Sequence, residues 1–136
     1  MSRYLLDTNI ISDVVRNSGG KAERKLRSMH GDEIGTSVIV KGEIVYGLKK
    51  NGSVRGRERL DRLLSAIPVW PLEEPAEEIY GDIRNQLRAA GAGIGPNDLW
   101  IAAHALAVGA VLVTANEGEF SRISGLKIEN WLATAE

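Results

Sequence analysis

Short apolar runs alternate along the chain with stretches in which apolar residues recur at helical spacing. The first run, Tyr4–Leu6, ends at Asp7, and apolar residues follow at positions 10, 11, 14 and 15, which predicts a strand and then a helix. The pattern repeats further on: Ile34–Thr36 predicts a second strand, and Val38–Lys50 predicts a helix with Ser37 as its N-cap.

The rest of the chain continues this alternation. Leucines at positions 60, 63 and 64 predict a basic amphipathic helix, and Ile67–Trp70, which contains one proline and is followed by another, predicts an edge strand or no strand. Asp98–Val108 is apolar on nearly all sides, which predicts a buried helix. The other predicted elements are a helix over Glu73–Ala90, a loop over Gly91–Asn97, a strand over Val111–Thr114 and a last edge strand over Lys127–Trp131. Strands that alternate with helices imply a parallel sheet with helices on both faces, the α/β class.

Length and composition fit one domain. The chain has 136 residues, of which 43% are hydrophobic and 26% charged, so we expect residues 1–136 to form a single domain and exclude two. Cysteine is absent, which excludes a disulfide framework, a thiol nucleophile and a zinc–thiolate site. A bound metal would need oxygen or imidazole ligands, and only His30 and His104 offer imidazole. We expect neither a signal peptide nor a membrane span, and a cytoplasmic protein.

The two halves of the chain carry opposite charge, although the net charge is −1. Residues 1–70 contain 13 Lys or Arg and 8 Asp or Glu, whereas residues 71–136 contain 4 and 10, which gives +5 and −6. A basic cluster in the first half is the candidate contact for RNA phosphates, with a solvated helix face as the alternative. Its members are Lys49, Lys50, Arg55, Arg57, Arg59 and Arg62.

Four acidic residues lie near the carboxyl ends of predicted strands, where ligands bind in α/β sheets. Asp7 follows the first strand, and Glu43 lies in the helix after the second. Asp98 opens the buried helix, and Glu119 lies in the loop after the strand over 111–114. Singly, each could be a helix cap, a first-turn acid or a solvated side chain. Together they favour a cation site, because buried carboxylates repel one another unless they are protonated or bound to a cation. Oxygen ligands suit Mg²⁺ or Mn²⁺, and such an ion suits hydrolysis of a phosphodiester.

Other kinds of site fit the sequence poorly. The chain contains no GxxxxGK[ST] loop, no glycine-rich loop directly after a strand and no GxSxG motif. His104 lies within the apolar helix, which favours a hydrogen-bonded interior histidine over a catalytic base.

Four segments, in their order and spacing, resemble the PIN-domain ribonucleases, and most closely the VapC toxins of type II toxin–antitoxin pairs with their FitB-like relatives. The segments are LDTNI at 6–10, Glu43 with Gly47, IGPNDLWIAAHA at 94–105, and LVTAN at 112–116 with EFSRI at 119–123 and Trp131. The resemblance covers nearly the whole chain, and between about Lys49 and Ala90 only the order of the elements corresponds.

The resemblance implies a three-layer α/β/α PIN-like fold with a central parallel sheet of about five strands, and a homodimer. It implies an endoribonuclease that uses Mg²⁺ or Mn²⁺ to cut single-stranded or loop RNA and so inhibits translation. The GPND-type helix start resembles members that cut initiator tRNA in its anticodon loop. The implied partner is a VapB-like antitoxin that neutralises the toxin, and DNA would be contacted only through that antitoxin.

The resemblance also implies roles for individual residues. Asp7, Glu43 and Asp98 correspond to the core acids, with Glu119 as the fourth; Asp7 and Asp98 would hold the ion, and Glu43 and Glu119 would contact it directly or through water. Thr8 and Asn116 would orient carboxylates or water.

Two features depart from the family pattern. Glu119 stands where many relatives have Asp. Because the glutamate side chain is longer, Glu119 could contact the metal through a water molecule or directly. Lys41 and Gly42 directly precede Glu43, and glycine costs a helix about 1 kcal/mol relative to alanine. The helix could therefore begin nearer Gly42 instead of at Val38. The two starts would give the side chain of Glu43 different positions.

Two other classes of protein remain as alternatives. A non-catalytic binding module would use the same acidic groove to hold an Arg-rich partner peptide. A phosphatase-like or receiver-like domain would also place acids at strand ends, but both use a lysine near the last strands, and Lys127 is the only late lysine.

Overall fold

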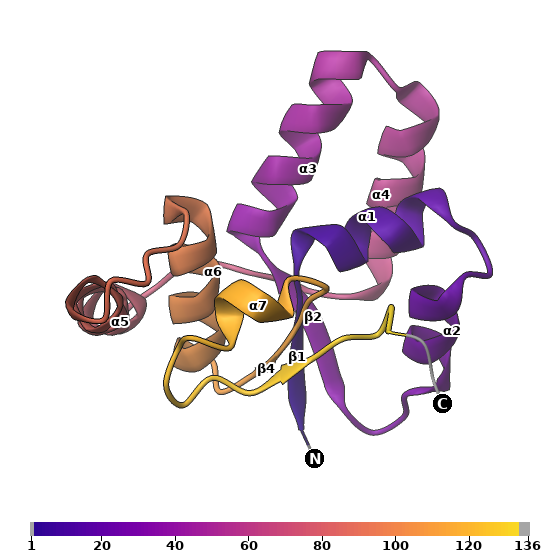
Figure 1. The fold of residues 1–136 in the computed structure, drawn as a ribbon. Coiled ribbons are helices and arrows are strands. Elements are labelled where there is room, and N and C mark those ends of the chain that lie inside the picture. The colour runs from indigo at the N-terminus through magenta and orange to yellow at the C-terminus, as the bar shows by residue number, and fades with distance from the viewer. Residues whose placement is uncertain (1, 134–136) are drawn as a thin grey trace.

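Five short strands pair in parallel into one sheet in the computed structural model, which describes residues 2–133 (Figure 1). The strand order is β3-β2-β1-β4-β5. The strands are β1 (Arg3–Leu6), β2 (Glu33–Ser37), β3 (Val69–Trp70), β4 (Val111–Val113) and β5 (Ile128–Glu129). The helices are α1 (Thr8–Arg16), α2 (Lys21–Ser28), α3 (Val38–Asn51), α4 (Val54–Ala66), α5 (Ala76–Ala89), α6 (Pro96–Ala107) and α7 (Glu117–Phe120). The predicted α/β class and the sheet of five parallel strands are confirmed.

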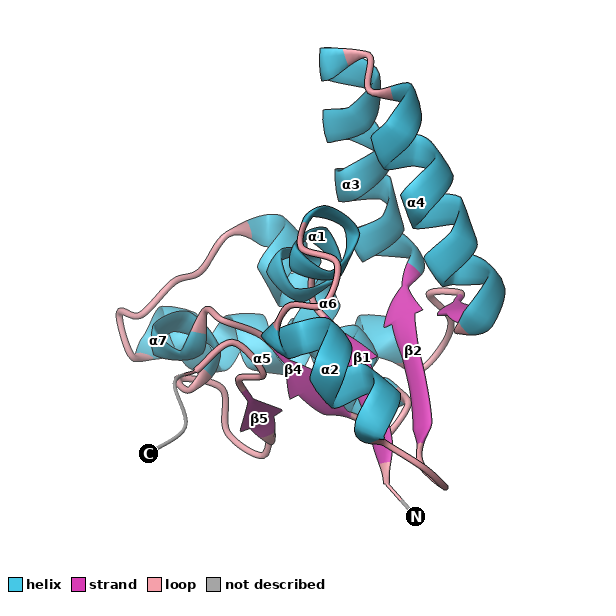
Figure 2. Cartoon of the chain, turned by 90° about the vertical axis from the view of Figure 1, so that its right-hand side faces the viewer, coloured by secondary structure: helices cyan, strands magenta, loops and turns pink. Residues whose placement is uncertain are grey.

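Helices cover both faces of the sheet. Helices α1 and α2 lie on one side, and α5 and α6 pack against each other on the other side (Figures 1 and 2). Helices α3 and α4 form a hairpin that rises beyond the carboxyl end of β2 (Figure 2). The chain thus has the predicted three-layer arrangement, with one helical hairpin projecting from it.

The carboxyl ends of the central strands meet at one edge of the sheet. Leu6 on β1 pairs with Thr36 on β2 and with Val113 on β4. Because all three strands run in the same direction, the residues that follow them, among them Asp7 and Thr114, emerge side by side. The backbone N–H of Asp7 donates to the carbonyl of Val113 at 2.8 Å, which extends the pairing one residue past the strand.

Local sequence accounts for where the main helices begin. The side chain of Ser37 accepts a hydrogen bond from the N–H of Ile39, so α3 begins at Val38 as predicted, and a start nearer Gly42 is wrong. Helix α6 begins at Pro96, two residues before the predicted start, because proline is well suited to the first helical position. That start places both Asn97 and Asp98 in the first turn of the helix.

Other predicted elements differ in detail. Helix α5 begins at Ala76, after Pro75, rather than at Glu73. Helix α2 was not predicted, because its sequence shows no apolar periodicity. Ala22 is its only buried residue. The strand predicted over Lys127–Trp131 is confirmed as an edge strand but pairs only at 128–129.

The hydrophobic core lies between the sheet and its helices. Leu5 and Leu6 of β1, with Leu112 of β4, are fully buried at its centre. His104 of α6 is also buried, and its Nδ1 lies 2.7 Å from Oγ of Ser37, so the predicted interior histidine with a hydrogen-bond partner is confirmed. Burial lowers the pKa of His104 and so favours the neutral imidazole. This contact ties α6 to the start of α3.

Within residues 2–133, no helix combines the length and the apolar character needed to span a membrane.

One glycine allows β2 and β3 to approach closely. A Cβ on Gly35 would lie 2.8 Å from Cζ2 of Trp70 and 2.9 Å from the carbonyl oxygen of Pro68.

We therefore expect Gly35→Ala to lower the free energy of unfolding by about 1–3 kcal/mol. Gly81→Ala on exposed α5, where the Cβ would meet nothing within 4 Å, is the matched control and should leave stability unchanged or raise it by up to about 1 kcal/mol. Urea unfolding measures both, and equal stability of the two variants would contradict the packing argument.

Candidate functional site

Asp7 is a buried acid at the carboxyl end of the central strand. Its side chain is 3% exposed and caps α1, with Oδ1 accepting a hydrogen bond from the N–H of Thr8 at 2.7 Å. Its Oδ2 accepts a hydrogen bond from Oγ1 of Thr114 at 2.7 Å. Burial raises the pKa of Asp7, the charge of Glu43 raises it further, and these two hydrogen bonds oppose the rise. The helix-cap interpretation is therefore correct, but it does not account for the burial or the nearby charge.

Glu43 of α3 points toward the same edge of the sheet. Its Oε1 accepts a short hydrogen bond from Oγ1 of Thr8, and its Oε2 accepts one from Nδ2 of Asn97 at 3.0 Å. Helix α3 is thereby joined both to the start of α1 and to the first turn of α6. Thr8 contacts a carboxylate, as predicted for a residue that orients one.

Asp98 and Glu119 complete the group of acids. Burial raises the pKa of Asp98 to about 7, and the charge of Asp7, the hydrogen bonding and charge of Glu119, and the charge of Glu43 all act in the same direction. Glu119 lies in the short helix α7 rather than in the predicted loop, and its Oε1 accepts a hydrogen bond from Nδ2 of Asn116 at 3.1 Å. The structure thus brings together all four predicted acids, hereafter the acidic group.

The acidic group has the chemistry of a site for a hard cation. Its donors are carboxylate oxygens, and burial together with the charges of the neighbouring acids disfavours the ionised form of Asp98, whose pKa rises to about 7. Within residues 2–133, no group of three or more acidic or histidine side chains is placed to hold a metal ion between them. An ion bound here would therefore have fewer than three of these side chains as direct ligands, as is usual for Mg²⁺, which keeps several waters and binds protein through one or two carboxylates.

Three further polar residues, beyond those given a predicted role, lie at the site. Thr114 and Asn97 donate hydrogen bonds to Asp7 and Glu43, and Oδ1 of Asn9 accepts one from the N–H of Ala115 at 3.0 Å. Thr114 ends a predicted strand, and that position could have indicated its role. The partner of Asn97 lies 54 residues away in the sequence, and no local pattern reveals it.

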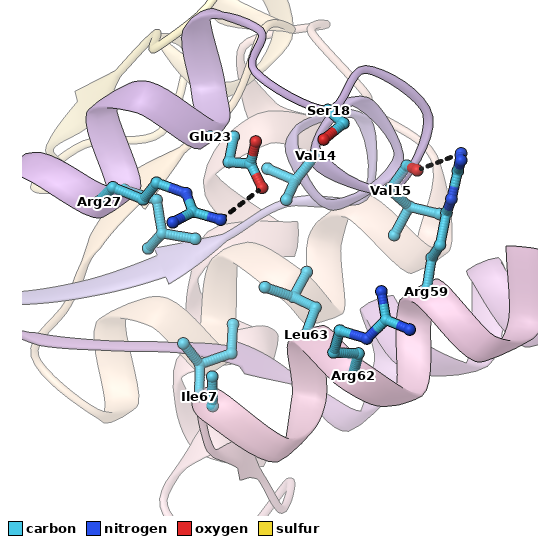
Figure 3. Close-up of a pocket in the computed structure, with 11 residues that line it drawn as sticks. Val14, Val15, Ser18, Glu23, Arg27, Arg59, Arg62, Leu63 and Ile67 are labelled. Atoms are coloured by element: carbon cyan, nitrogen blue, oxygen red, sulfur yellow. Dashed lines mark hydrogen bonds and ion pairs between the residues drawn. The ribbon is translucent and has the colours of Figure 1, made fainter.

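The members of the basic cluster lie in three different surroundings in the structure. Lys49, Lys50 and Arg55 are exposed near the tip of the α3–α4 hairpin. Arg57 pairs with Asp61 at 3.1 Å, which matches the alternative of a solvated helix face for that residue. Figure 3 shows Arg59 and Arg62 beside a cavity of about 500 Å³ between α1, α2 and α4, where Nη1 of Arg59 donates to the carbonyl of Val15 at 3.4 Å.

A parallel sheet in this order, with acids gathered at its carboxyl edge, places the chain among three-layer α/β domains with an acidic site at the ends of the strands. The sequence model for the PIN domain matches residues 4–126, and the chain belongs to the PIN-domain family.

Named relatives of this chain are VapC proteins. It is 36% identical to Ribonuclease VapC2 of Rickettsia felis over 130 residues, which cover 94% of this chain and 97% of that protein. It is 32% identical to the tRNA(fMet)-specific endonuclease VapC of Shigella flexneri over 132 residues, which cover 96% and 99%. The predicted resemblance to VapC is confirmed.

Two solved structures contain chains with the same fold. VapBC2 from Rickettsia felis, bound to a DNA fragment from its promoter, contains a chain with a TM-score of 0.88 and 35% identity, over 95% of this chain and 98% of that one. The FitAcB structure from Neisseria gonorrhoeae gives a TM-score of 0.81 and 26% identity, over 94% and 97%. The predicted likeness to FitB is therefore confirmed as well.

The raised pKa of Asp98 has a consequence for stability. In metal-free protein, folding favours the protonated carboxyl, so this contribution to stability is present below about pH 4 and is lost as the pH rises through about 7. We expect Asp98→Asn to be more stable than the parent chain at about pH 8, and the difference to be much smaller at about pH 4.

Thermal unfolding in EDTA at the two pH values measures this effect. Asp82→Asn, the same change at an exposed position of α5, should show no such pH-dependent gain. An equal effect of Asp98→Asn at both pH values would contradict the repulsion within the acidic group.

Proposed function

We propose that this protein is the toxin of a VapBC-type toxin–antitoxin pair and a metal-dependent endoribonuclease, with residues 1–136 as a single nuclease domain. The observation that carries the proposal is the acidic group: four carboxylates from separate segments gather at the carboxyl edge of the sheet, where burial and the charges of the other three raise the pKa of Asp98 to about 7. Membership of the PIN-domain family and the names of the VapC relatives support the same activity. We place the protein in the cytoplasm, where cellular RNA is accessible to it.

Mg²⁺ or Mn²⁺ is the proposed cofactor. Asp7 and Asp98 would hold the ion, and Glu43 and Glu119 would contact it directly or through water. When bound, it would neutralise charge on the phosphodiester and lower the pKa of a water molecule.

The polar residues of this chain keep the acids in place for that task. Thr8 and Thr114 hold the two oxygens of Asp7 by hydrogen bonds, so the carboxylate cannot turn freely. Asn97 donates a hydrogen bond to Glu43, and Asn116 donates one to Glu119, which supports the proposed role of Asn116 in orienting a carboxylate. These donors lower the cost of bringing several negative charges together before a cation binds.

The proposed partners are an RNA substrate, a VapB-like antitoxin that neutralises the toxin and a second copy of the chain in a homodimer. DNA would be contacted only through the antitoxin. The solved complexes of similar chains support the antitoxin and this indirect route to DNA. Initiator tRNA, cut in its anticodon loop with loss of translation, is the substrate we propose, supported by the name of the Shigella flexneri relative.

We expect Asp7→Asn to reduce RNA cleavage at least about a hundredfold, because a carboxylate that holds the ion is removed while asparagine still caps α1. EDTA should abolish cleavage by the parent chain, and Mg²⁺ or Mn²⁺ should restore it. Sequencing of RNA ends after brief induction, together with cleavage of purified tRNA, measures both effects. Asp82→Asn on α5 is the matched control.

Activity that persists in Asp7→Asn or in EDTA would contradict the metal mechanism. Absence of cleavage with every divalent ion, together with metal-independent binding of an Arg-rich peptide, would instead identify a binding module.

The exposed lysines of the basic cluster give a separate prediction about binding. Replacing Lys49 and Lys50 by alanine should weaken RNA binding and reduce the slope of log affinity against log salt by about 0.7 for each phosphate that the protein no longer neutralises. The control is Lys21→Ala with Lys25→Ala, the same change of charge on α2. Fluorescence anisotropy at several salt concentrations measures the slopes, and an unchanged slope for the Lys49 and Lys50 variant would leave these residues as a solvated helix face.

A further inference from the structure

Tyr46 is an exposed aromatic residue beside the acidic group. Its side chain is 66% exposed, and it lies three residues after Glu43 on α3, so the two share a face of the helix. Tyrosine at an exposed helical position contributes little to the core, and an exposed aromatic ring offers a flat apolar surface to a ligand. The core of this protein does not account for Tyr46.

Gly42 opens a space next to this ring. It lies four residues before Tyr46 on the same face, inside a helix, where glycine is less favourable than alanine. A Cβ at this position would meet nothing within 4 Å, so packing within the protein does not require glycine. The missing side chain leaves room beside Tyr46 and Glu43.

These residues line a hollow, which we call the α3 hollow. It has a volume of about 490 Å³, and its lining residues are Ile39, Gly42, Glu43, Tyr46 and Asn97. One wall carries the hydrogen bond between Asn97 and Glu43. The hollow therefore combines an aromatic ring and an aliphatic side chain with amide and carboxylate groups.

The position of the hollow relates it to the proposed reaction. At one end Glu43 belongs to the acidic group. At the other end, three and four residues beyond Tyr46, the exposed Lys49 and Lys50 continue along the same side of α3. An RNA strand could place one phosphate at the lysines and another at the acidic group. The nucleotide between these two phosphates would then lie next to Tyr46.

We propose that the α3 hollow holds one unpaired nucleobase of the RNA, stacked on Tyr46, next to the phosphodiester that is cut. Bases of single-stranded RNA stack on exposed aromatic side chains, whereas a base within a duplex cannot enter such a hollow. Tyr46 is a positioning residue in this proposal, and it selects for single-stranded or looped RNA. The inference rests on the proposed nuclease function.

The first test measures RNA binding without cleavage. In the inactive Asp7→Asn background, Tyr46→Ala should weaken binding of a labelled mixed-sequence single-stranded RNA of about twelve nucleotides by about tenfold. Tyr46→Phe keeps the ring and should bind within about twofold of the parent. Gly42→Leu should also weaken binding, because it fills the hollow while Tyr46 remains. Val54→Ala is the control, since Val54 is 73% exposed at the start of α4 and lies outside the hollow.

The second test uses the active chain. With an RNA cut at a mapped site, Tyr46→Ala should raise KM more than it lowers kcat, and Tyr46→Phe should restore KM. Removal of the base next to the cut should weaken binding to the parent chain but add little to the defect of Tyr46→Ala, because the two changes remove the same interaction.

Each result decides one of the two proposals. Normal cleavage and binding by both Tyr46→Ala and Gly42→Leu would overturn the base-binding role and leave the nuclease function standing. Loss of dimerisation with unchanged RNA binding in Tyr46→Ala would also overturn it, and would show that a second copy covers the ring. If the parent chain cuts no RNA but its binding still depends on Tyr46, the hollow is a base-binding site and the nuclease proposal fails.

Discussion

The burial of several carboxylates close to one another is the constraint on which the rest of this structure depends. Asp7 is buried at the end of the central strand. Burial, and then the charges of Asp7, Glu119 and Glu43, raise the pKa of Asp98 to about 7. A fold without a use for this charge would replace the acids with apolar residues, because burying unpaired like charges costs free energy. Four carboxylates are held near one another by the sheet and by the positions at which the helices begin. The surrounding amides and hydroxyls hold them as well until a cation binds.

The parallel sheet and the helix starts supply that support. Asp7 and Thr114 emerge side by side because Leu6 pairs with Val113, and the hydroxyl of Thr114 then reaches the Asp7 carboxylate. The contact between His104 and Ser37 ties the helix that carries Asp98 to the helix that carries Glu43. Glu43 in turn accepts hydrogen bonds from residues on two other helices. Core packing and the geometry of the acidic group are therefore coupled, since a shift of α3 or α6 would change the distances between the charges.

The sequence was sufficient for features that depend on local pattern and insufficient for features that depend on contacts between distant segments. The strand before Asp7, the cap at Ser37 and the buried helix after Asp98 follow from apolar spacing and capping chemistry. Helix α2 was missed because its eight residues are mostly charged and bury only Ala22. The hydrogen bonds that Thr114 and Asn97 donate could not be predicted, because their partners lie 107 and 54 residues away. Tyr46 stands out only when its exposure and the open space at Gly42 are known.

The central claim is that the acidic group stores unfavourable negative charge that a divalent cation relieves. An NMR titration of the side-chain carboxyl carbon of Asp98, with and without Mg²⁺, tests it most directly. Without the ion, the account predicts a pKa of about 7 for Asp98. With saturating Mg²⁺, it predicts a pKa far below that value, because the cation favours the charged carboxylate. A pKa near the ordinary value of 3.8 in metal-free protein, unchanged by Mg²⁺, would contradict the account.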